Sequence, residues 1–591
     1  MAGAGGRRPR WGRNTNCAGF GLKEIEVGTL FSSLDIARSG LQTSQVQLDV
    51  AAHNIANVNK EGFSRQRVDL ATRSPISRPF GQIGRGVQVQ QIARVRDEFL
   101  DTAFRAAAPS LGRAELETRF FGQLQDAFLE PGENAFGARV NQFFDVMSDF
   151  ANNVEQTPLR QSVITEAESV ANFLRQTTVR IGDLRTNANA EVRNAAPEIN
   201  SLSERIAVLN ARITRAELGG TQASDLRDER DLLVDQLANI VDINVSQRES
   251  GELNIFVGDE ILVDGQERRR VEARMNPAID PTRPDFVQIQ FEDNGNLLPA
   301  ANGELAGALR MRDEVLREAL DDVNTLAAGL IHGINRVHSQ GNGLVNYSGT
   351  IEGTNAVADT AAPLSESGGL FPPQSGTFDL VLYDADGNPT VNTIDVDVNG
   401  SLQDLAAEIS NVAGVSASIT GDNRLAIDVD PASTFSFAND TAGILPALGV
   451  NGLFTGTGAA DIGINQQIRS NPGLLTSSFS LDPADTGDNS AALAMADVRD
   501  QRILDGGNAS VNEFYESVIV ELGVNARTTE QQLNLERVFV DDFQRRRQEI
   551  SGVSLDEEVT LMLQYQRAFE ASTRVITTTD RMLEALINIV R

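Results

Sequence analysis

Near the start of the chain, apolar and small residues recur at alternating spacings of four and three positions. The set is Leu30, Leu34, Ala37, Leu41, Ser44, Leu48, Ala51 and Ile55. This heptad-like rhythm predicts a helix with one narrow apolar seam, of the kind that packs against a partner helix.

The end of the chain carries a second seam with the same rhythm. Its members are Leu561, Tyr565, Ala568, Ser572, Val575, Thr579, Met582, Leu586 and Ile589. Helices this short and this weakly apolar are not stable alone. We therefore expect the two terminal helices to pair as a coiled coil and to pack on neighbouring subunits.

The first seam runs into a segment that contains Asn54, Asn57, Asn59 and Gly62. Asn and Gly tolerate left-handed backbone, so the segment predicts a helix end followed by a turn. A helix cap accounts for part of this pattern. We also expect the turn to lie at a subunit contact, where it fixes how the terminal helix meets its neighbour.

The middle of the chain changes its period several times. Alternation over 64–71 and 86–93 predicts short strands in an extended arm, and residues 94–240 are helical in pattern. Breaks between helices are expected at Pro131-Gly132, Pro158 and Gly219-Gly220. Pro197 is expected to begin a helix, because proline suits the first helical turn.

From residue 241 apolar residues alternate with polar ones, and a Ser250-Gly251 turn between two such runs predicts a hairpin. A further strand is expected over 285–291 and a helix from 304 to about 337. Alternation returns from residue 376, with a turn at Asp386-Gly387-Asn388, a short helix over 402–412, and strands over 415–419 and 425–429.

Together these patterns predict an α+β multidomain protein. It has paired terminal helices, a long helical-bundle domain, a β-rich hairpin region and a separate β-rich insert domain. The expected parts are an extension (1–26), the N-terminal helix and arm (27–105), a helical domain (106–340) with hairpins (241–300), a linker (341–375), the insert domain (376–470), a loop-rich return (471–508), a helical return (509–550) and the C-terminal helix (551–591).

Composition narrows the possible functions. The net charge is −31, and such an acidic body repels nucleic acid and anionic membrane. Cys17 is the only cysteine, which excludes a disulfide framework or a thiolate metal site. His332 and His338 are six positions apart, so one helix face would not bring them together as ligands. No 18-residue apolar run predicts a membrane helix.

Residues 1–26 are basic and lack the apolar stretch of a secretory signal. We expect this segment to lie outside the native protein, with Val27 as the encoded start. The alternative is a genuine disordered extension. A natural N-terminal peptide containing Trp11 would decide for the extension.

No catalytic residue, cofactor site or metal site is predicted. The Asp384-Ala-Asp386-Gly387-Asn388 stretch has its Gly at the fourth position, whereas a calcium loop needs it at the sixth, so a hairpin turn is the better reading. The neighbouring acids Glu557 and Glu558 do not face each other on a helix. Their place at a helix start suits the helix dipole better than acid–base chemistry.

Two segments resemble the terminal regions of flagellar axial proteins: Ser33 to Gln66 near the start of the chain, and 551–558 with 565–576 near its end. The stretch from Ala52 to Gln66 reads Ala-His-Asn-Ile-Ala-Asn-Val-Asn-Lys-Glu-Gly-Phe-Ser-Arg-Gln. It is similar to the Asn-Asn-Ile-Ala-Asn-x-x-Thr-x-Gly-Tyr signature of rod, hook and hook-associated proteins. Here His53 replaces the first Asn, Lys60 stands at the Thr position and Phe63 replaces Tyr.

Several stretches are similar to the family of the first hook-associated protein in particular. They are Ser64-Arg65-Gln66, the block from Asp225 to Asp235 with 257–265, and the C-terminal stretches 551–558 and 565–576. The Asp225 block disfavours hook and rod proteins, and flagellin is disfavoured because its own N-terminal signature is missing. The resemblance covers most of 28–340 and 500–591, and the insert at 376–470 resembles inserted domains of flagellin-like proteins more weakly.

The resemblance implies a structural, non-enzymatic subunit of the bacterial flagellum at the hook–filament junction. It implies coiled-coil ends inside a tube, mixed outer domains, and export by the flagellar type III apparatus without a cleaved signal. The implied partners are a ring of further copies, the hook protein, a second junction protein and an export chaperone. Alternatives are another axial protein, such as hook protein or a flagellin-like subunit, and surface adhesion or a hidden enzyme in the insert domain.

Overall fold

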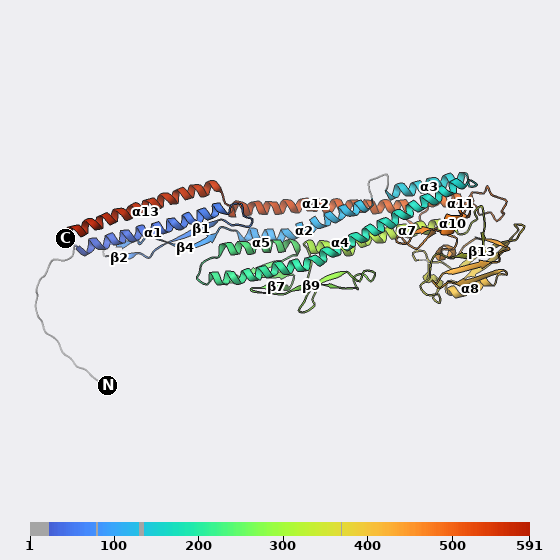
Figure 1. Cartoon of the computed structure of the whole chain (residues 1–591), viewed down its shortest axis with the longest axis horizontal. Helices are drawn as coiled ribbons and strands as arrows, with labels where there is room; N and C mark the ends of the chain where they lie inside the picture. Colours follow the sequence, from blue (N-terminus) through green and yellow to red (C-terminus); the bar gives the residue numbers. More distant parts are fainter. Residues whose placement is uncertain (1–22, 79–80, 129–134, 368, 591) are drawn as a thin grey trace, which may run out of the picture.

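The computed structural model describes residues 23–78, 81–128, 135–367 and 369–590 of the chain. The described part is elongated (Figure 1). Helices α1 (Lys23–Ala56) and α13 (Leu555–Val590) lie at one end, a helical shaft forms the middle, and a β-rich unit stands at the other end. The expected boundary between residues 26 and 27 falls inside α1, and most of the segment before it lies outside the described residues.

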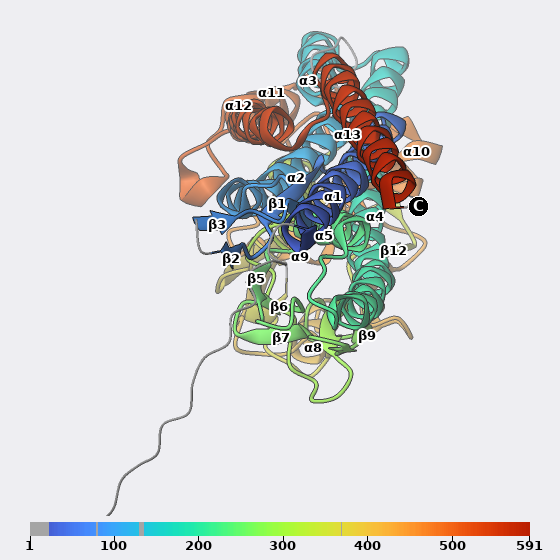
Figure 2. The same cartoon turned by 90° about the vertical axis from the view of Figure 1, so that its left-hand side faces the viewer.

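Helices α1 and α13 lie side by side and run antiparallel (Figures 1 and 2). Asn54 near the end of α1 contacts Glu558 near the start of α13, and Gly40 lies against Ser572. Residues that are earlier in α1 therefore lie beside residues that are later in α13. The pairing joins the two ends of the described chain, as the two seams predict.

An extended arm follows α1 and packs on it. Strands β1 (Gln66–Thr72) and β4 (Val87–Arg94) pair antiparallel, and a small hairpin of β2 (Ile76–Arg78) and β3 (Gly81–Ile83) lies between them in sequence. The Val87 N–H donates to Ser39 Oγ of α1 at 3.2 Å. The two main strands of this arm were predicted, whereas the β2–β3 hairpin was not.

The shaft is built from long helices around a phenylalanine-rich core. Its helices are α2 (Glu98–Phe128), α3 (Phe136–Asn152), α4 (Thr157–Glu217), α5 (Ser224–Ile240), α6 (Glu304–Arg310), a π-helical segment (Met311–Val315), α7 (Leu316–His338) and α12 (Val511–Ser551). Phe136, Phe143, Phe144 and Phe150 are fully buried. The predicted breaks at Pro158 and Gly219-Gly220 are confirmed, since α4 starts and ends there. The expected break at Pro131-Gly132 lies outside the described residues.

The prediction that Pro197 begins a helix is wrong. Pro197 lies inside α4, which runs unbroken for 61 residues. Pro197 is exposed, and so is Arg193, whose carbonyl loses its helical hydrogen bond. Val192, Ala196 and Ile199 around it are buried, and their packing keeps the helix continuous.

A β-rich region lies along one side of α4 (Figure 1). Strands β5 (Asn244–Gln247), β6 (Leu253–Val257), β7 (Glu260–Asp264) and β8 (Glu267–Arg268) form one sheet, and β9 (Val271–Met275) pairs with β10 (Val287–Phe291). The predicted turn at Ser250-Gly251 joins β5 to β6, and Gly251 has a φ of +83°. The hairpin prediction for this region is therefore confirmed.

The far end holds two further sheets, with strand orders β11-β17-β13-β14 and β12-β16-β15. Their strands are β11 (Tyr347–Ser348), β12 (Thr350–Glu352), β13 (Gly376–Tyr383), β14 (Pro389–Val396), β15 (Val415–Ile419), β16 (Leu425–Val429) and β17 (Thr434–Ala438), with α8 (Leu402–Ser410) alongside. The Asp384–Asn388 stretch is the turn between β13 and β14, as predicted. Asp384 accepts hydrogen bonds from the N–H groups of Asp386 and Asn388.

Residues 341–375, expected as a linker, are part of this unit. They contribute β11 and β12, which pair with β17 and β16. Tyr347, Ile351 and Leu364 are buried there. These isolated apolar residues among many Gly and Ser gave no periodic signal, although each fills a place in the core.

Short elements complete the return to the shaft. They are α9 (Ile444–Leu448), β18 (Phe454–Thr455), β19 (Gly463–Ile464), α10 (Gln466–Ser470) and α11 (Ser490–Ala496), with 3-10 turns between them. The architecture is α+β and rich in helix. Among the described residues, no helix combines the length and the apolar character that crossing a membrane requires.

Candidate functional site

The candidate site is the end of the molecule formed by α1, α13 and the joint that connects them to the shaft. On α1 the small seam residues Ala37, Ser44 and Ala51 are buried. The large seam residues are only half-buried; they are Leu34, Leu41, Leu48 and Ile55. The two helices therefore approach each other through small residues, and a Cβ added at Gly40 would lie 3.0 Å from Ser572 Oγ.

On α13 the least exposed line is displaced from the predicted seam. It follows Met562, Tyr565, Phe569, Ser572, Ile576, Thr579 and Leu583, again at alternating spacings of three and four. Tyr565, Ser572 and Thr579 belong to both lines. The pairing face is thus rotated by about one residue from the expected one.

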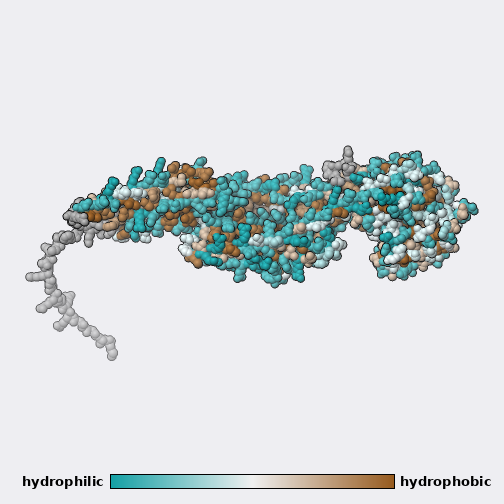
Figure 3. Space-filling view, in the orientation of Figure 1, coloured by the Kyte–Doolittle hydropathy of each residue, from teal (hydrophilic) through white to brown (hydrophobic). Residues whose placement is uncertain are grey.

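This rotation leaves an apolar edge of α13 in solvent. Val575 is 47% exposed and Met582 is 54% exposed, and Ala568 is exposed as well. Leu561 is half-buried. The side chains of Leu586 and Ile589, also named as seam residues, lie outside the described residues. Figure 3 shows apolar side chains gathered over this end of the molecule.

The turn after α1 is held by Asn54, which is almost fully buried. Asn54 Nδ2 donates to Gln66 O at 3.0 Å and to Glu558 Oε2 at 3.2 Å, and the Gln66 N–H donates back to Asn54 Oδ1 at 3.0 Å. One side chain thus ties the end of α1 to the arm and to α13. Such a buried amide with all of these bonds made fixes the three segments relative to one another.

The other turn residues have separate places. Asn57 Nδ2 donates to His53 O at 3.0 Å and closes the helix end. Gly62 has a φ of +75°, which favours glycine, and lies against Leu232 of α5. Asn59 is exposed and lines a hollow of about 840 Å³ between the turn and the end of α12.

Arg65 binds the break between α12 and α13. Its guanidinium donates to Glu558 Oε1 at 2.7 Å and Glu557 Oε2 at 2.9 Å, and its N–H donates to Ser551 O at 2.8 Å. At Gly552, a Cβ would collide with Gln548 O, so the chain can turn here only with glycine. Helix α12 ends at Ser551 and α13 begins at Leu555, and Glu557 and Glu558 of α13 serve as ion-pair partners of Arg65.

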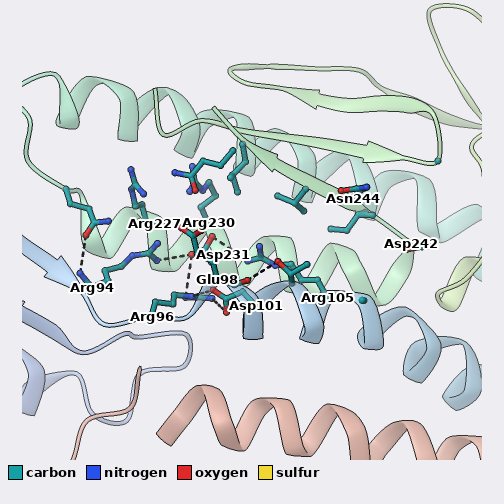
Figure 4. A pocket seen from close by; sticks show the side chains of 18 residues that line it. Arg94, Arg96, Glu98, Asp101, Arg105, Arg227, Arg230, Asp231, Asp242 and Asn244 are labelled. Atoms are coloured by element: carbon teal, nitrogen blue, oxygen red, sulfur yellow. Dashed lines mark hydrogen bonds and ion pairs between the residues drawn. The ribbon is translucent and has the colours of Figure 1, made fainter. Parts of the chain in front are cut away.

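Three aspartates on one face of α5 receive arginines from the arm and from α2. Figure 4 labels one of them, Asp231, together with Arg94, Arg96 and Arg105. Arg94 Nη1 donates to Asp228 Oδ1 at 2.7 Å and to Asp231 Oδ2 at 2.8 Å. Arg105 Nε donates to Asp235 Oδ1 at 2.7 Å. These contacts lie beside a hollow of about 790 Å³ and fasten β4 and α2 to α5.

The same network reaches α12. Arg547 Nε donates to Asp101 Oδ1 at 2.7 Å, and Arg547 Nη2 donates to Asp235 Oδ2 at 2.8 Å. Arg96 Nε donates to the second oxygen of Asp101 at 2.5 Å. The joint therefore links four elements, β4, α2, α5 and α12, through ion pairs between mostly buried groups.

The electrostatics of the joint follow from its burial. Burial acts to raise the pKa of Asp231, but Arg96, Arg94 and Arg105 outweigh it and hold that pKa well below its usual value. At Asp228, burial prevails over Arg94 and raises the pKa. Removing one partner from such a network leaves an uncompensated buried charge, which costs about 3–5 kcal/mol. The arrangement is suited to hold β4, α2, α5 and α12 at fixed angles to one another.

Sequence reasoning missed this network. Asp225, Asp228, Asp231 and Asp235 recur at spacings of three, three and four, which places them on one face of α5. That acidic face was a readable signal, whereas its arginine partners lie more than a hundred positions away in sequence. Among the described residues, no cluster of His, Cys, Asp and Glu is arranged to hold a metal ion.

Three family models match the chain. The model described as "Flagellar hook-associated protein FlgK helical domain" matches residues 121–353. "Flagellar basal body rod FlgEFG protein C-terminal" matches 544–589, and "Flagella basal body rod protein" matches 34–63. The two rod-protein matches cover much of α13 and α1, and the helical-domain match covers α3 to α7.

Relatives of similar length carry one name, flagellar hook-associated protein 1. The protein of Bacillus subtilis (strain 168) is 26% identical over 571 residues, covering 94% of this chain and 98% of that protein. The Salmonella typhimurium protein is 27% identical and the Escherichia coli (strain K12) protein 26% identical, each covering 94% of this chain and 100% of the relative. The solved flagellar hook junction protein FlgK of Burkholderia pseudomallei matches with a TM-score of 0.49 at 17% identity, over 76% of this chain and 100% of that one.

Proposed function

We propose that this chain, a homologue of flagellar hook-associated protein 1, is a structural subunit that assembles at the junction between the flagellar hook and filament. Similarity over nearly the whole length of the named relatives supports the assignment. The observation that carries the mechanism is the apolar edge left uncovered beside the α1–α13 pair.

The pairing of α1 and α13 buries small residues and leaves larger ones available. Val575 and Met582 on α13 are about half exposed, and Leu41 and Leu48 on α1 are half-buried. Each large apolar side chain gains about 1.5–3 kcal/mol when it is fully buried. Neighbouring copies that cover these residues would complete a coiled-coil-like bundle and so drive assembly.

The charged joint supplies the second part of the proposed mechanism. Arg65, Asn54 and Glu558 fix the terminal pair to the arm, and Arg547 with Asp235 fixes the shaft to the same region. The terminal helices and the shaft then move as one body when a neighbour binds. Such a subunit can adapt a flexible hook to a stiffer filament.

The partners proposed for the assembled protein are further copies in a ring, the hook protein below and a second junction protein above. Before assembly, an export chaperone and the flagellar type III apparatus would deliver the chain without a cleaved signal. The terminal helices would pass the narrow channel unfolded and order fully where neighbours bury their apolar edges. We propose no catalytic activity, and the relatives carry the name flagellar hook-associated protein 1.

Deletion of the gene tests the proposal. Cells should retain hooks and lose filaments, and the wild-type gene supplied in trans should restore them. Electron microscopy of isolated hook–basal bodies, with antibody against this chain, should place it at the hook tip. Normal filaments in the deletion strain would refute the assignment.

A further inference from the structure

An arginine-rimmed groove lies along the last third of α4, beside α5 and β8. Arg205, Arg212, Arg268 and Arg270 line it together with Glu204, Glu229 and apolar Val208, around a hollow of about 580 Å³. Val208 is 53% exposed. The groove therefore combines an excess of positive charge with an apolar contact point on a chain whose net charge is −31.

Two of these arginines lack a partner within the described part of the chain. Arg205 and Arg212 are exposed and make no ion pair there, whereas Arg268 pairs with Glu204 at 2.9 Å. Most other arginines of the shaft are engaged, as at the joint. An unneutralised pair of arginines beside an exposed valine fits an acidic and apolar protein surface.

A surface of that kind lies on the first half of α12. Val520 is 65% exposed and Val524 is exposed one turn further on, and Glu516 and Glu521 flank them. Neither glutamate makes an ion pair among the described residues. This α12 face is opposite in charge to the α4 groove, and both surfaces carry exposed valine.

Neighbouring carboxylates of α7 add to the negative charge of this face. Burial, together with Glu318, Glu521 and Asp321, raises the pKa of Asp322 to about 6. Negative charges therefore crowd where α7 meets α12, and only Asp321 among them pairs with an arginine, Arg317, at 3.2 Å. A cationic partner would relieve this repulsion.

The two faces belong to different sides of the molecule. In the end-on view α12 and α4 lie on opposite flanks (Figure 2). They also differ in height along the shaft: the end of α4 lies near the joint, where Glu217 binds Arg227, while the start of α12 packs near Phe136 at the far end. One copy therefore cannot bring its own two faces together.

We propose that the arginine groove of α4 in one copy docks on the acidic, apolar face of α12 in the neighbouring copy. This inference rests on the proposed function, which supplies the neighbours. Contacts between two different faces are heterologous and propagate from copy to copy. Because the faces lie at different heights, successive copies are staggered along the long axis.

Charge reversal tests the contact. R205E/R212E, expressed in the deletion strain, should reduce the fraction of cells with filaments at least tenfold, and E516R/E521R should do the same. Combining all four substitutions restores opposite charges on every contact, so filaments should return. The matched control R180E/R274E changes the same charge at two exposed positions outside the groove, where neither arginine makes an ion pair among the described residues, and should behave as wild type.

Two outcomes would overturn the contact while leaving the proposed function intact. They are normal filaments in both double variants, or no recovery in the quadruple variant whose purified monomer melts like wild type. If the wild-type gene failed to restore filaments in the deletion strain, the result would instead contradict the proposed function.

Cross-linking gives a measurement that does not depend on charge. In a background with Cys17→Ser, V208C/V520C should form disulfide-linked multimers in isolated hook–basal bodies after mild oxidation. V208C alone and V520C alone should remain largely monomeric on a non-reducing gel. Absence of multimers from the double variant, at wild-type incorporation, would exclude this pairing of faces.

Discussion

At the scale of single residues, Asn54 shows how one side chain can organise a joint. It is buried, and it connects the backbone of Gln66 in the arm with Glu558 of α13. No apolar residue of similar size could replace those bonds. The Asn-rich turn was predicted from sequence, but its link to a residue about 500 positions away depends on the antiparallel pairing of the chain ends.

Asn54→Ala should therefore weaken the joint. The change leaves the N–H and carbonyl of Gln66 without partners in a buried place, at a cost on the order of 3 kcal/mol. Hydrogen exchange in the purified monomer should show faster exchange over 45–66 and at the start of α13. Asn59→Ala is the control, since Asn59 is exposed, and equal exchange in the two variants would contradict the role of Asn54.

His338 gives a second residue-scale prediction, at the far end of the shaft. It is fully buried, its Nδ1 lies 2.8 Å from Asn451 O, and the Thr476 N–H donates to its Nε2. With the acceptor role taken by Nε2, the ring is neutral. Burial lowers the pKa of His338 to about 4, from an ordinary value of 6.5.

A lowered histidine pKa makes stability fall with acid. The contribution of the neutral, buried His338 to the free energy of unfolding is fully present above pH 6.5. It is lost as the pH falls toward 4, because His338 of the unfolded chain is protonated at a higher pH than His338 of the folded protein. The shift corresponds to about 3 kcal/mol at most. Calorimetry of the wild type should show a falling melting temperature across this range, and His338→Gln should flatten the fall. An unchanged slope in the variant would assign the acid sensitivity to other groups.

At the scale of elements, the rhythm of the seams was sufficient to predict two pairing helices but not which edge of α13 faces α1. The predicted and observed lines share Tyr565, Ser572 and Thr579, and differ by one position elsewhere. Both edges are apolar, so the pattern alone did not distinguish them. The choice depends on how α13 packs against α1, where the small residues Ala37, Ser44 and Ala51 are buried.

Other element-scale errors have the same origin. Pro197 carries a local preference for a helix start, and the packing of Val192 and Ile199 overrides it. The stretch 341–375 has no periodic pattern, and its two short strands exist because β17 and β16 offer edges to pair with. Local patterns predicted most helices and hairpins of the shaft, whereas tertiary partners decided these cases.

Gly40→Leu should separate α1 from α13. Glycine-to-leucine changes in a helix gain roughly 0.5–1 kcal/mol of propensity, so the same change should stabilise a site with free space. At Gly40, however, an added Cβ lies 3.0 Å from Ser572 Oγ, and a full leucine would push the helices apart. Gly182→Leu on α4 is the matched control, because nothing lies within 4 Å of its added Cβ.

Hydrogen exchange over α1 and α13 checks this prediction. We expect loss of protection in both helices for Gly40→Leu and unchanged protection there for Gly182→Leu. If Gly40→Leu protected the pair as well as wild type, the close approach at Ser572 would not be a determinant of pairing.

At the scale of the whole molecule, the family-specific sequence motifs are distributed according to the part of the elongated molecule in which they lie. The terminal pair and its turn carry the motifs shared with axial proteins, and the rod-protein family models match there. The shaft carries the helical-domain match and the buried charges of the joint. The β-rich far end is held to the shaft by buried groups such as Arg160, which donates to Ser477 Oγ at 3.0 Å.

The same view separates folding of one copy from assembly of many, because α13 has two faces with different tasks. Thr579 is buried on the face of α13 that packs against α1. Val575 and Met582 lie on the uncovered edge of α13 and face solvent in a single copy. V575E/M582E should leave the melting temperature of the monomer nearly unchanged, since exposed substitutions usually alter stability by less than about 0.5 kcal/mol. In the assembled junction those glutamates would be buried without partners, so filaments should be lost.

Thr579→Glu should instead destabilise the monomer itself, because it places a charge between α1 and α13 of the same copy. We expect reduced protection of α1 and α13 in the monomer before any assembly is attempted. Comparing monomer melts with filament counts in the complemented deletion strain distinguishes the two faces. If V575E/M582E supported normal filaments, the uncovered edge of α13 would not be buried between copies, and assembly would have to depend on other surfaces of the rod.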